Sequence, residues 1–246
     1  MSWWDYGHWI TAIAHRIPVA NPFQQNARTA ANYLIETDEN KANNMLDELD
    51  VKYIITDYPM VDFLATPTYP NPKYVMPIWA GKNPNPFQTI EVRLHYFDGS
   101  ERLPEGIPAL QHYRLVYESS TFVLPYMLTD PETEKAVGWR TYHGSQLPIE
   151  NDLELLHNGV RMEDIPYIAS TPRIFSPMAY VKIFEYVDGK IVKEEAPLNS
   201  SYTLSVDVIT NQGREFVYNQ TQVEDNGYCT FVVPYEGEYR IEVKND

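Results

Sequence analysis

Cysteine is nearly absent from this sequence of 246 residues, which contains only Cys229. One thiol cannot form an internal disulfide and cannot supply a zinc site made of four cysteines. Cys229 lies on the same face of a predicted strand as Phe231 and Val233, so we expect it to be buried and chemically inert.

Basic residues are also scarce. The chain has 19 lysines and arginines against 34 aspartates and glutamates, and its formal net charge is -15. Proteins that bind nucleic acids need clustered cations to displace counterions from the phosphates, so we expect no nucleic-acid partner. The acidic residues form no run of five or six, which indicates a solvated surface rather than an acidic tail.

Long hydrophobic runs are missing as well. No stretch approaches the roughly 20 apolar residues that a membrane-spanning helix needs. The longest candidate, residues 119–129, is interrupted by Pro125. The first residues lack the basic and apolar regions of a signal peptide. We therefore expect this polypeptide to be soluble, although a longer protein that contains it need not be.

The common catalytic motifs are not found. The sequence has no Gly-x-Ser-x-Gly, no phosphate-binding P-loop, no Gly-x-Gly-x-x-Gly and no His-Glu-x-x-His. Its histidines are scattered. His8 and His15 would share one face of a helix, but a zinc site needs three or four converging ligands. A metallohydrolase therefore has no support from residue spacing.

What the sequence does contain, in its first half, is helical periodicity. Apolar residues recur at helical spacing from Phe23 to Leu34 and from Ala42 to Leu49. Thr37 and Asp38 precede the second run as candidate caps. A third helical stretch covers about residues 87–97. These segments predict the helices of a mixed α/β fold of the α+β type.

Three segments of the same region predict strands. Residues 51–56 read as a buried strand, and residues 113–117 and 180–186 predict two strands that pair with it. We expect residues 1–187 to form a helix-rich core around this small central sheet, which carries the Trp-Trp-Asp-Tyr-Gly segment described below. Within this core, residues 119–178 include six prolines, and we interpret them as a possible irregular insertion.

The pattern changes after residue 187. Apolar and polar residues alternate strictly from Tyr202 to Val208 and from Tyr239 to Val243, as on half-buried strands. Asn226-Gly227 is a hairpin turn signal. We expect residues 188–246 to form a small antiparallel β domain.

The least ordinary segment is Trp3-Trp4-Asp5-Tyr6-Gly7. An indole offers one hydrogen-bond donor, and an ionised carboxylate only accepts. A small hydroxyl does both, so it can satisfy the Trp/Asp pair completely. A methyl group in its place would leave buried polar groups unpaired, at a cost of about 1–3 kcal/mol each. The segment is therefore suited to binding Ser or Thr and rejecting Ala.

Two other interpretations fit the same residues. The tryptophans could fill a hydrophobic seam, with Asp5 as the N-cap of a helix over residues 6–16. Alternatively, the chain could be a non-catalytic cell-envelope or carbohydrate-binding module, in which Trp3 and Trp4 stack on a sugar ring.

A family resemblance favours the hydroxyl-binding interpretation. Trp-Trp-Asp-Tyr-Gly is the signature of the catalytic subunit of oligosaccharyltransferase, the membrane glycosyltransferase of N-glycosylation, and its setting here resembles the archaeal AglB type. The segments that carry the resemblance span nearly the whole chain: residues 2–10, 18–22, 50–57, 111–119, 181–187 and 231–235.

The resemblance implies that this chain is the C-terminal globular domain of such an enzyme, on the extracytoplasmic side of the cell membrane. There the pentapeptide binds the hydroxyl residue of an Asn-x-Ser/Thr acceptor. Carried over to this sequence, Trp3, Trp4 and Asp5 would contact that hydroxyl, and Tyr6 and Gly7 would shape the turn.

A second family motif reads Asp-x-x-Lys or Met-x-x-Ile, with variants, and helps to hold the same acceptor residue. Its best match here is Asp57-Tyr58-Pro59-Met60, in which methionine replaces lysine. The resemblance thus implies binding roles for Asp57 and Met60. Met60 could contact the threonine methyl group, or it could be an ordinary core residue.

In the family, the divalent metal (Mn or Mg) and the acidic residues that bind it belong to a membrane-embedded part with no counterpart here. The resemblance implies that this fragment contains no catalytic residue, metal ligand or bound cofactor and does not transfer glycan alone. Its partners would be the acceptor polypeptide and, through the membrane part, the membrane and the lipid-linked oligosaccharide. The chain itself contains two acceptor sequences, at Asn199 and Asn219.

Overall fold

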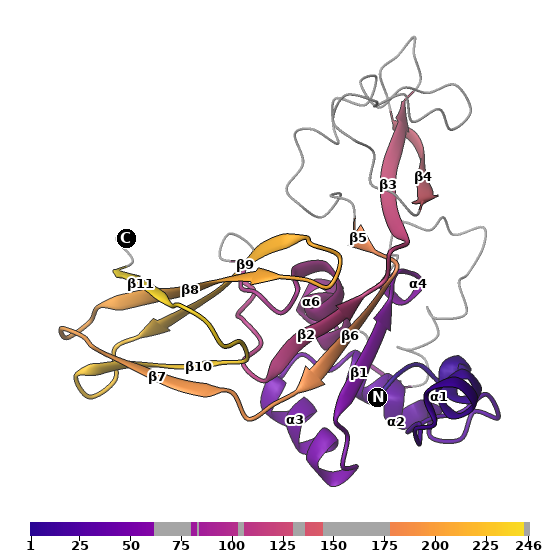
Figure 1. Cartoon of the computed structure of the whole chain (residues 1–246), viewed down its shortest axis with the longest axis horizontal. Coiled ribbons are helices and arrows are strands. Elements are labelled where there is room, and N and C mark those ends of the chain that lie inside the picture. The colour runs from indigo at the N-terminus through magenta and orange to yellow at the C-terminus, as the bar shows by residue number, and fades with distance from the viewer. Residues whose placement is uncertain (62–79, 83, 103–105, 130–135, 145–177, 244–246) are drawn as a thin grey trace.

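The computed structural model describes residues 1–61, 80–82, 84–102, 106–129, 136–144 and 178–243, with the backbone alone for residues 124–129 and 136–144. It has the mixed α/β architecture that the sequence predicts (Figure 1). Helices flank a small central sheet, and further antiparallel sheets extend from it on two sides. Within the described ranges, every helix is too short or too polar to cross a bilayer.

The helices confirm most of the predicted segments. Asp38 caps α3 by accepting hydrogen bonds from the backbone N–H groups of Asn40 and Lys41. The helix predicted from Phe23 begins only at Ala27, and Phe23 lies exposed in the preceding turn. The helical elements are η1 (Trp4–Tyr6), α1 (Gly7–Ala14), α2 (Ala27–Leu34), α3 (Glu39–Glu48), α4 (Tyr58–Val61), η3 (Pro86–Gln88) and α6 (Ile90–Phe97).

The central sheet contains the three predicted strands, β1 (Tyr53–Asp57), β6 (Val181–Tyr186) and β2 (Tyr113–Glu118), in that order. Both pairings are antiparallel, and Phe184 stands opposite Ile54 on one side and Leu115 on the other. These three residues are buried in the main core. The three predicted strands therefore lie in one sheet, but only β6 pairs with β1 directly, and β2 pairs with β6 instead.

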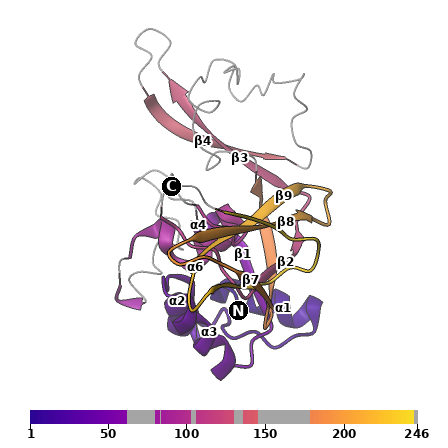
Figure 2. The same ribbon diagram turned by 90° about the vertical axis from the view of Figure 1, so that its left-hand side faces the viewer.

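The segment predicted as irregular, residues 119–178, contains regular structure. β3 (Phe122–Thr129) pairs antiparallel with β4 (Ala136–Gly144) and, at Phe122 and Val123 only, with β5 (Met178–Ala179). Among the described strands, β3 has a partner on one side only at Pro125, and such an edge position tolerates proline. Figure 2 shows this pair projecting away from α2 and α3. Residues 145–177 lie outside the described residues.

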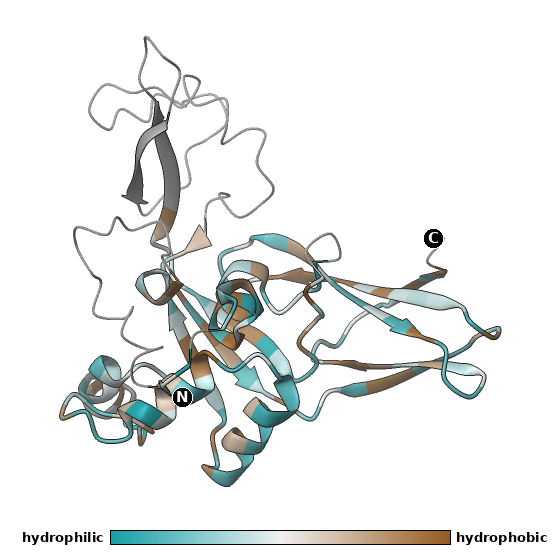
Figure 3. Ribbon diagram, turned by 180° about the vertical axis from the view of Figure 1, so that it is seen from behind, coloured by the Kyte–Doolittle hydropathy of each residue, from teal (hydrophilic) through white to brown (hydrophobic). Residues whose placement is uncertain are grey.

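The predicted change to β structure after residue 187 is confirmed. Two antiparallel sheets follow, β10-β7 and β11-β8-β9, and Figure 3 shows hydrophobic and hydrophilic residues alternating along their strands. Asn226 and Gly227 both have positive φ, as a tight hairpin turn requires. Cys229 is buried, as predicted. The strands are β7 (Lys190–Glu195), β8 (Ser201–Ile209), β9 (Glu215–Val223), β10 (Tyr228–Val233) and β11 (Arg240–Val243).

The β-rich part is attached to the central sheet by a buried cluster of charges. The Arg214 guanidinium donates to both carboxylate oxygens of Asp98 and of Glu118 at 2.7–3.2 Å. Lys182, on β6, donates to Asp98 Oδ1 at 2.6 Å. Burial opposes ionisation of Asp98, but the two cations outweigh it and lower its pKa. The cluster therefore joins α6, β2 and β6 to β9.

His95 of α6 lies beside this cluster and is fully buried. Its Nδ1 is hydrogen-bonded to Thr56 Oγ1 on β1 at 2.9 Å. Burial, and next the charge of Lys182, hold the pKa of His95 well below 6.5. His95 is therefore neutral in the folded protein at pH values where it is protonated in the unfolded chain.

This difference in protonation predicts a pH-dependent stability. Below pH 6.5 the unfolded state binds one more proton at His95 than the folded state does. As the pH decreases below this value, His95 should therefore lower the free energy of unfolding by about 1.4 kcal/mol for each pH unit. Urea unfolding at pH 7.5 and pH 5.5 measures the effect. His95→Gln should reduce the difference between the two pH values, whereas His15→Gln, at an exposed position, should leave it unchanged. An equal pH dependence in all three proteins would contradict the prediction.

Candidate functional site

The Trp3–Gly7 segment lies against the free edge of the central sheet. The backbone oxygen of Met1 accepts a hydrogen bond from the N–H of Ile55 on β1 at 2.8 Å. After this contact, the chain turns into η1 and then α1. The pentapeptide thus forms a short helical bend beside β1.

The two tryptophans occupy different environments. Trp3 is 0% exposed and belongs to the main core. Its ring lies 6.0 Å from that of Trp4, at an interplanar angle of 51°. Trp4 is only partly buried, but its Nε1 is inaccessible to solvent and has no hydrogen-bond partner among the described residues. An unpartnered buried donor is costly, so the Trp4 N–H would gain from a further acceptor atom, which reaches it only when the groups that cover it move aside.

The burial of Trp3 favours a packing role, because its side chain has no exposed surface in this structure. The contact of Trp3 with an acceptor hydroxyl stays a prediction. Asp5 is not the N-cap of a helix: it lies inside η1, and the residue at the N-cap of α1 is Tyr6. The hydrophobic-seam interpretation therefore describes Trp3 but not the whole pentapeptide.

Tyr6 connects the pentapeptide to the second predicted motif. Its hydroxyl donates a hydrogen bond to Asp57 Oδ2. Asp57, fully buried at the end of β1, accepts a second bond at Oδ1 from the backbone N–H of Met60 at 3.0 Å. Burial raises the pKa of Tyr6 far above its ordinary value, and the Asp57 charge raises it further. Tyr6 therefore remains a protonated donor to Asp57.

Asp57 and Met60 are both near the pentapeptide, but their side chains differ in what they contact. Asp57 holds η1 through Tyr6 and the start of α4 through Met60. Met60 is 5% exposed and packs in the main core. In this structure, the core interpretation of Met60 accounts for its burial.

Sequence reasoning assigned Tyr180 only to a strand, yet its side chain lies in the same environment. Its backbone oxygen accepts from the N–H of Tyr58 at 2.8 Å. Burial raises the pKa of Tyr180, followed by the charges of Asp57 and Asp5. The Tyr180 hydroxyl is therefore within the electrostatic influence of both carboxylates. No local sequence signal could have indicated this, because more than 100 residues separate Tyr180 from Asp57.

Gly7 is required by a close approach between two backbone segments. A Cβ at this position would lie 2.5 Å from the backbone oxygen of Ala20 and 2.7 Å from Cα of Asn21. The absence of a side chain thus allows α1 to start directly against residues 20–21. This contact fixes the direction in which the chain leaves η1.

Gly7→Ala should therefore lower the free energy of unfolding by about 1–3 kcal/mol, because the backbone of residues 20–21 must move to admit the methyl group. Chemical denaturation measures the change. Ala12→Ser, at an exposed position on the same helix, should change stability by less than about 0.5 kcal/mol. Equal stabilities of the Gly7 variant and the native protein would refute the close-packing argument.

The charged residues of this site do not form a metal centre. Nowhere in the described ranges do three or more His, Cys, Asp or Glu residues come together in a way that could hold a metal ion. His8 packs instead against the ring of Phe23, at 5.3 Å between centroids. The described residues therefore do not fit a resident divalent metal.

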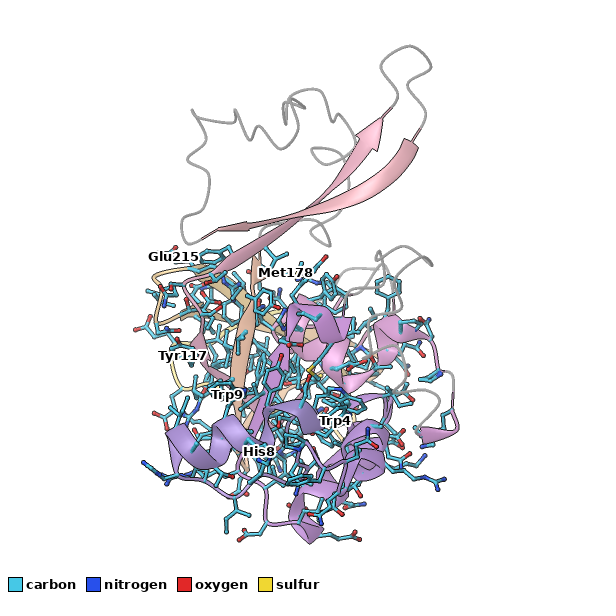
Figure 4. The ribbon with its side chains drawn as sticks, turned by 90° about the vertical axis from the view of Figure 1, so that its right-hand side faces the viewer. Trp4, His8, Trp9, Tyr117, Met178 and Glu215 are labelled. Atoms are coloured by element: carbon cyan, nitrogen blue, oxygen red, sulfur yellow. The ribbon has the colours of Figure 1, made fainter. Side chains whose placement is uncertain are left out.

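An exposed apolar surface lies next to the pentapeptide, and we call it the α1 surface. Trp9 and Ile13 on α1, together with Ile17 and Phe23 beyond it, are 65–98% exposed. Figure 4 shows Trp9 and His8 at the same end of the molecule as Trp4, away from Met178 and Glu215. Four large apolar side chains exposed within 15 residues of an acidic chain indicate a contact surface.

Comparisons with known proteins agree with the resemblance of the sequence. Residues 1–61 match the family model of the AglB core domain, and residues 189–245 match that of the archaeal glycosylation protein B long peripheral domain. Dolichyl-phosphooligosaccharide-protein glycotransferase 3 of Archaeoglobus fulgidus is 28% identical over 96% of this chain. The dolichyl-monophosphooligosaccharide–protein glycotransferase AglB of Haloferax volcanii is also 28% identical over 96%. The chain covers 32% and 29% of these two relatives, about a third of their length.

Solved structures show the same fold. The Archaeoglobus fulgidus oligosaccharyltransferase tethered to an acceptor peptide with an Asn-Val-Thr sequon matches 99% of this chain and 35% of its own, with a TM-score of 0.65 and 25% identity. A structure of that enzyme with zinc and sulfate matches 99% of this chain and 38% of its own, with a TM-score of 0.64 and 24% identity. Metal binding thus occurs in the family. The chain thus resembles archaeal AglB oligosaccharyltransferases over nearly its whole length, with AglB family models matched at both of its ends.

Proposed function

We propose that this chain is the acceptor-recognition domain of an oligosaccharyltransferase, which transfers a lipid-linked oligosaccharide to the asparagine of Asn-x-Ser/Thr. The observation that carries the proposal is the buried Nε1 of Trp4, which has no partner among the described residues and is followed directly by the carboxylate of Asp5. A solved relative of the same fold holds an acceptor peptide with an Asn-Val-Thr sequon.

Each residue of the site has a defined role in this proposal. The Trp4 indole donates to the oxygen of the Ser or Thr hydroxyl, and Asp5 accepts its proton. Asp57 positions η1 through the Tyr6 hydroxyl. Trp3 supports Trp4 from the core, and Gly7 sets the direction of the turn.

The rest of the activity is assigned to parts of the enzyme beyond this chain. We place there the catalytic carboxylates, the divalent metal (Mn or Mg) and the site for the lipid-linked oligosaccharide, with this domain on the extracytoplasmic side of the membrane. The α1 surface gives the membrane part an apolar area to pack against, directly beside the acceptor site. The isolated chain should accordingly show no transfer activity.

The carbohydrate-module alternative is less compatible with the structure. Stacking of a sugar on both tryptophans requires an accessible face on each ring. Trp3 is fully buried and offers none.

A hybrid enzyme tests the proposal. The corresponding C-terminal part of the Archaeoglobus fulgidus oligosaccharyltransferase is replaced by this chain, and glycan transfer to an Asn-Val-Thr peptide is measured. The expected result is transfer by the hybrid and none by the isolated chain. Transfer by the isolated chain, or a folded hybrid that is inactive, would overturn the assignment. Thermal unfolding of the hybrid establishes that it is folded.

A further inference from the structure

The chain contains two acceptor sequences of the kind that its own family modifies, and the two lie in different structural environments. Asn199 and Ser200 lie in the connection between β7 and β8, and Ser201 is the first residue of β8, whereas Asn219-Gln220-Thr221 lies within β9. We propose that Asn199 is an N-glycosylation site of this protein and that Asn219 is protected by the fold. The proposal rests on the proposed function in one respect only, which is that this domain lies on the extracytoplasmic side of the membrane.

Asn199 has the accessibility that glycan transfer requires. It is exposed in a turn, next to Leu198, which is 80% exposed. Its backbone N–H donates to Glu224 Oε2 at 3.3 Å, which fixes the turn. Among the described residues, none forms a hydrogen bond with its side-chain amide or with the Ser201 hydroxyl. Both groups that an oligosaccharyltransferase must engage are therefore free.

Asn219 is held through both its side-chain oxygen and its backbone. Its Oδ1 accepts from Ser205 Oγ at 2.7 Å, and its backbone N–H donates to Ser100 Oγ at 2.9 Å. Thr221, the hydroxyl residue of this second sequence, donates from Oγ1 to Glu101 at 2.7 Å and from its backbone N–H to Glu101 at 2.6 Å. Presenting Asn219 to an enzyme would require β9 to separate from β8 and from Glu101, at the cost of a whole strand ladder.

The position of Asn199 also determines which enzyme molecule can modify it. The connection between β7 and β8 lies at the opposite end of the long axis from α1 and the pentapeptide (Figure 1). Asn199 therefore cannot reach the acceptor site of its own chain. Glycosylation must be carried out by a second enzyme molecule.

The reaction requires a donor of the lipid-phosphate-linked oligosaccharide class. The Asn199 Nδ2 forms a bond to C1 of the reducing sugar, and the C1–O bond to the lipid phosphate breaks. The lipid phosphate leaves with the electron pair of that bond, and the amide nitrogen loses one proton. The sugar transfer is balanced without an oxidant or a reductant.

The test uses this chain as the substrate of purified Archaeoglobus fulgidus oligosaccharyltransferase with its lipid-linked oligosaccharide, followed by peptide mass spectrometry. The expected result is a glycan on Asn199 of the folded chain and none on Asn219. Ser201→Ala should abolish the modification, and Asn219→Gln should leave it unchanged. A synthetic peptide of residues 215–223 should accept glycan, because it has no fold to protect Asn219.

A folded chain without glycan on Asn199 would overturn the proposal, provided that the enzyme modifies an Asn-Val-Thr peptide in the same assay. Glycan on Asn219 of the folded chain at the level of Asn199 would also overturn it. Because the enzyme here is the relative and not this chain, the outcome does not depend on the activity of the hybrid. Failure of this proposal and failure of the proposed function are therefore distinguishable.

Discussion

Asp5→Ala in the hybrid enzyme is expected to lower kcat/KM for an Asn-Val-Thr acceptor about 10- to 150-fold. The variant removes the group that accepts the acceptor hydroxyl's proton, and a lost hydrogen bond to a charged group costs about 1.5–3 kcal/mol. Initial rates of transfer to a labelled peptide, at several peptide concentrations, measure the effect.

Asp207→Ala is the matched control for this variant. Asp207 is an exposed aspartate of β8 that pairs with Arg240, far from the pentapeptide in the sequence. Its replacement should leave kcat/KM within about twofold, since exposed ion pairs contribute little. Similar losses in the two variants would contradict a specific role for Asp5.

Arg214→Met is expected to lower the free energy of unfolding of the isolated chain by about 3–5 kcal/mol, because breaking a buried ion pair leaves a charge without its partner. The side chain of Glu118 is fully buried, and that of Asp98 nearly so. Methionine preserves much of the side-chain volume but none of the hydrogen bonds to these carboxylates. Urea denaturation, followed by circular dichroism, measures the loss.

Arg240→Met provides the comparison, because Arg240 also pairs with an aspartate through two nitrogens, Nη1 and Nη2. The side chains of Arg240 and of its partner Asp207 are both half exposed or more. The expected loss is below about 1 kcal/mol. If the two arginine variants lost equal stability, burial would not explain how much the ion pairs of Arg214 contribute to the free energy of unfolding.

Local sequence patterns predicted the elements that depend on local chemistry. The cap at Asp38, the hairpin turn at Asn226-Gly227 and the alternation along β8 each follow from neighbouring residues. The existence of the three central strands was also predictable from their apolar runs, but their order was not, because β2 pairs with β6 and not with β1.

The arrangement of the site required the structure. The sequence suggested equal roles for Trp3 and Trp4, and only the packing shows that Trp3 belongs to the core. The Tyr6–Asp57 bond joins residues 51 positions apart. A pattern read along the chain has no means of detecting a contact of this kind.

The charged residues show a second limit of sequence reasoning. The acidic side chains were interpreted mostly as solvated surface, yet Asp98 and Glu118 are buried. Their partners are Lys182 on β6 and Arg214 just before β9, both distant in the sequence, so no local charge pattern marks the cluster. The β3–β4 pair was missed for a related reason: Pro125 indicates a loop unless the partner strands are known.

The central claim is that the Trp4–Asp5 pair binds the acceptor hydroxyl. The most direct measurement is the affinity of the folded hybrid, without lipid-linked donor, for two peptides that differ only in Asn-Val-Thr against Asn-Val-Ala. We predict that the threonine peptide binds about 10-fold or more tightly, and that Asp5→Ala removes the difference. Equal affinities for the two peptides would contradict the claim.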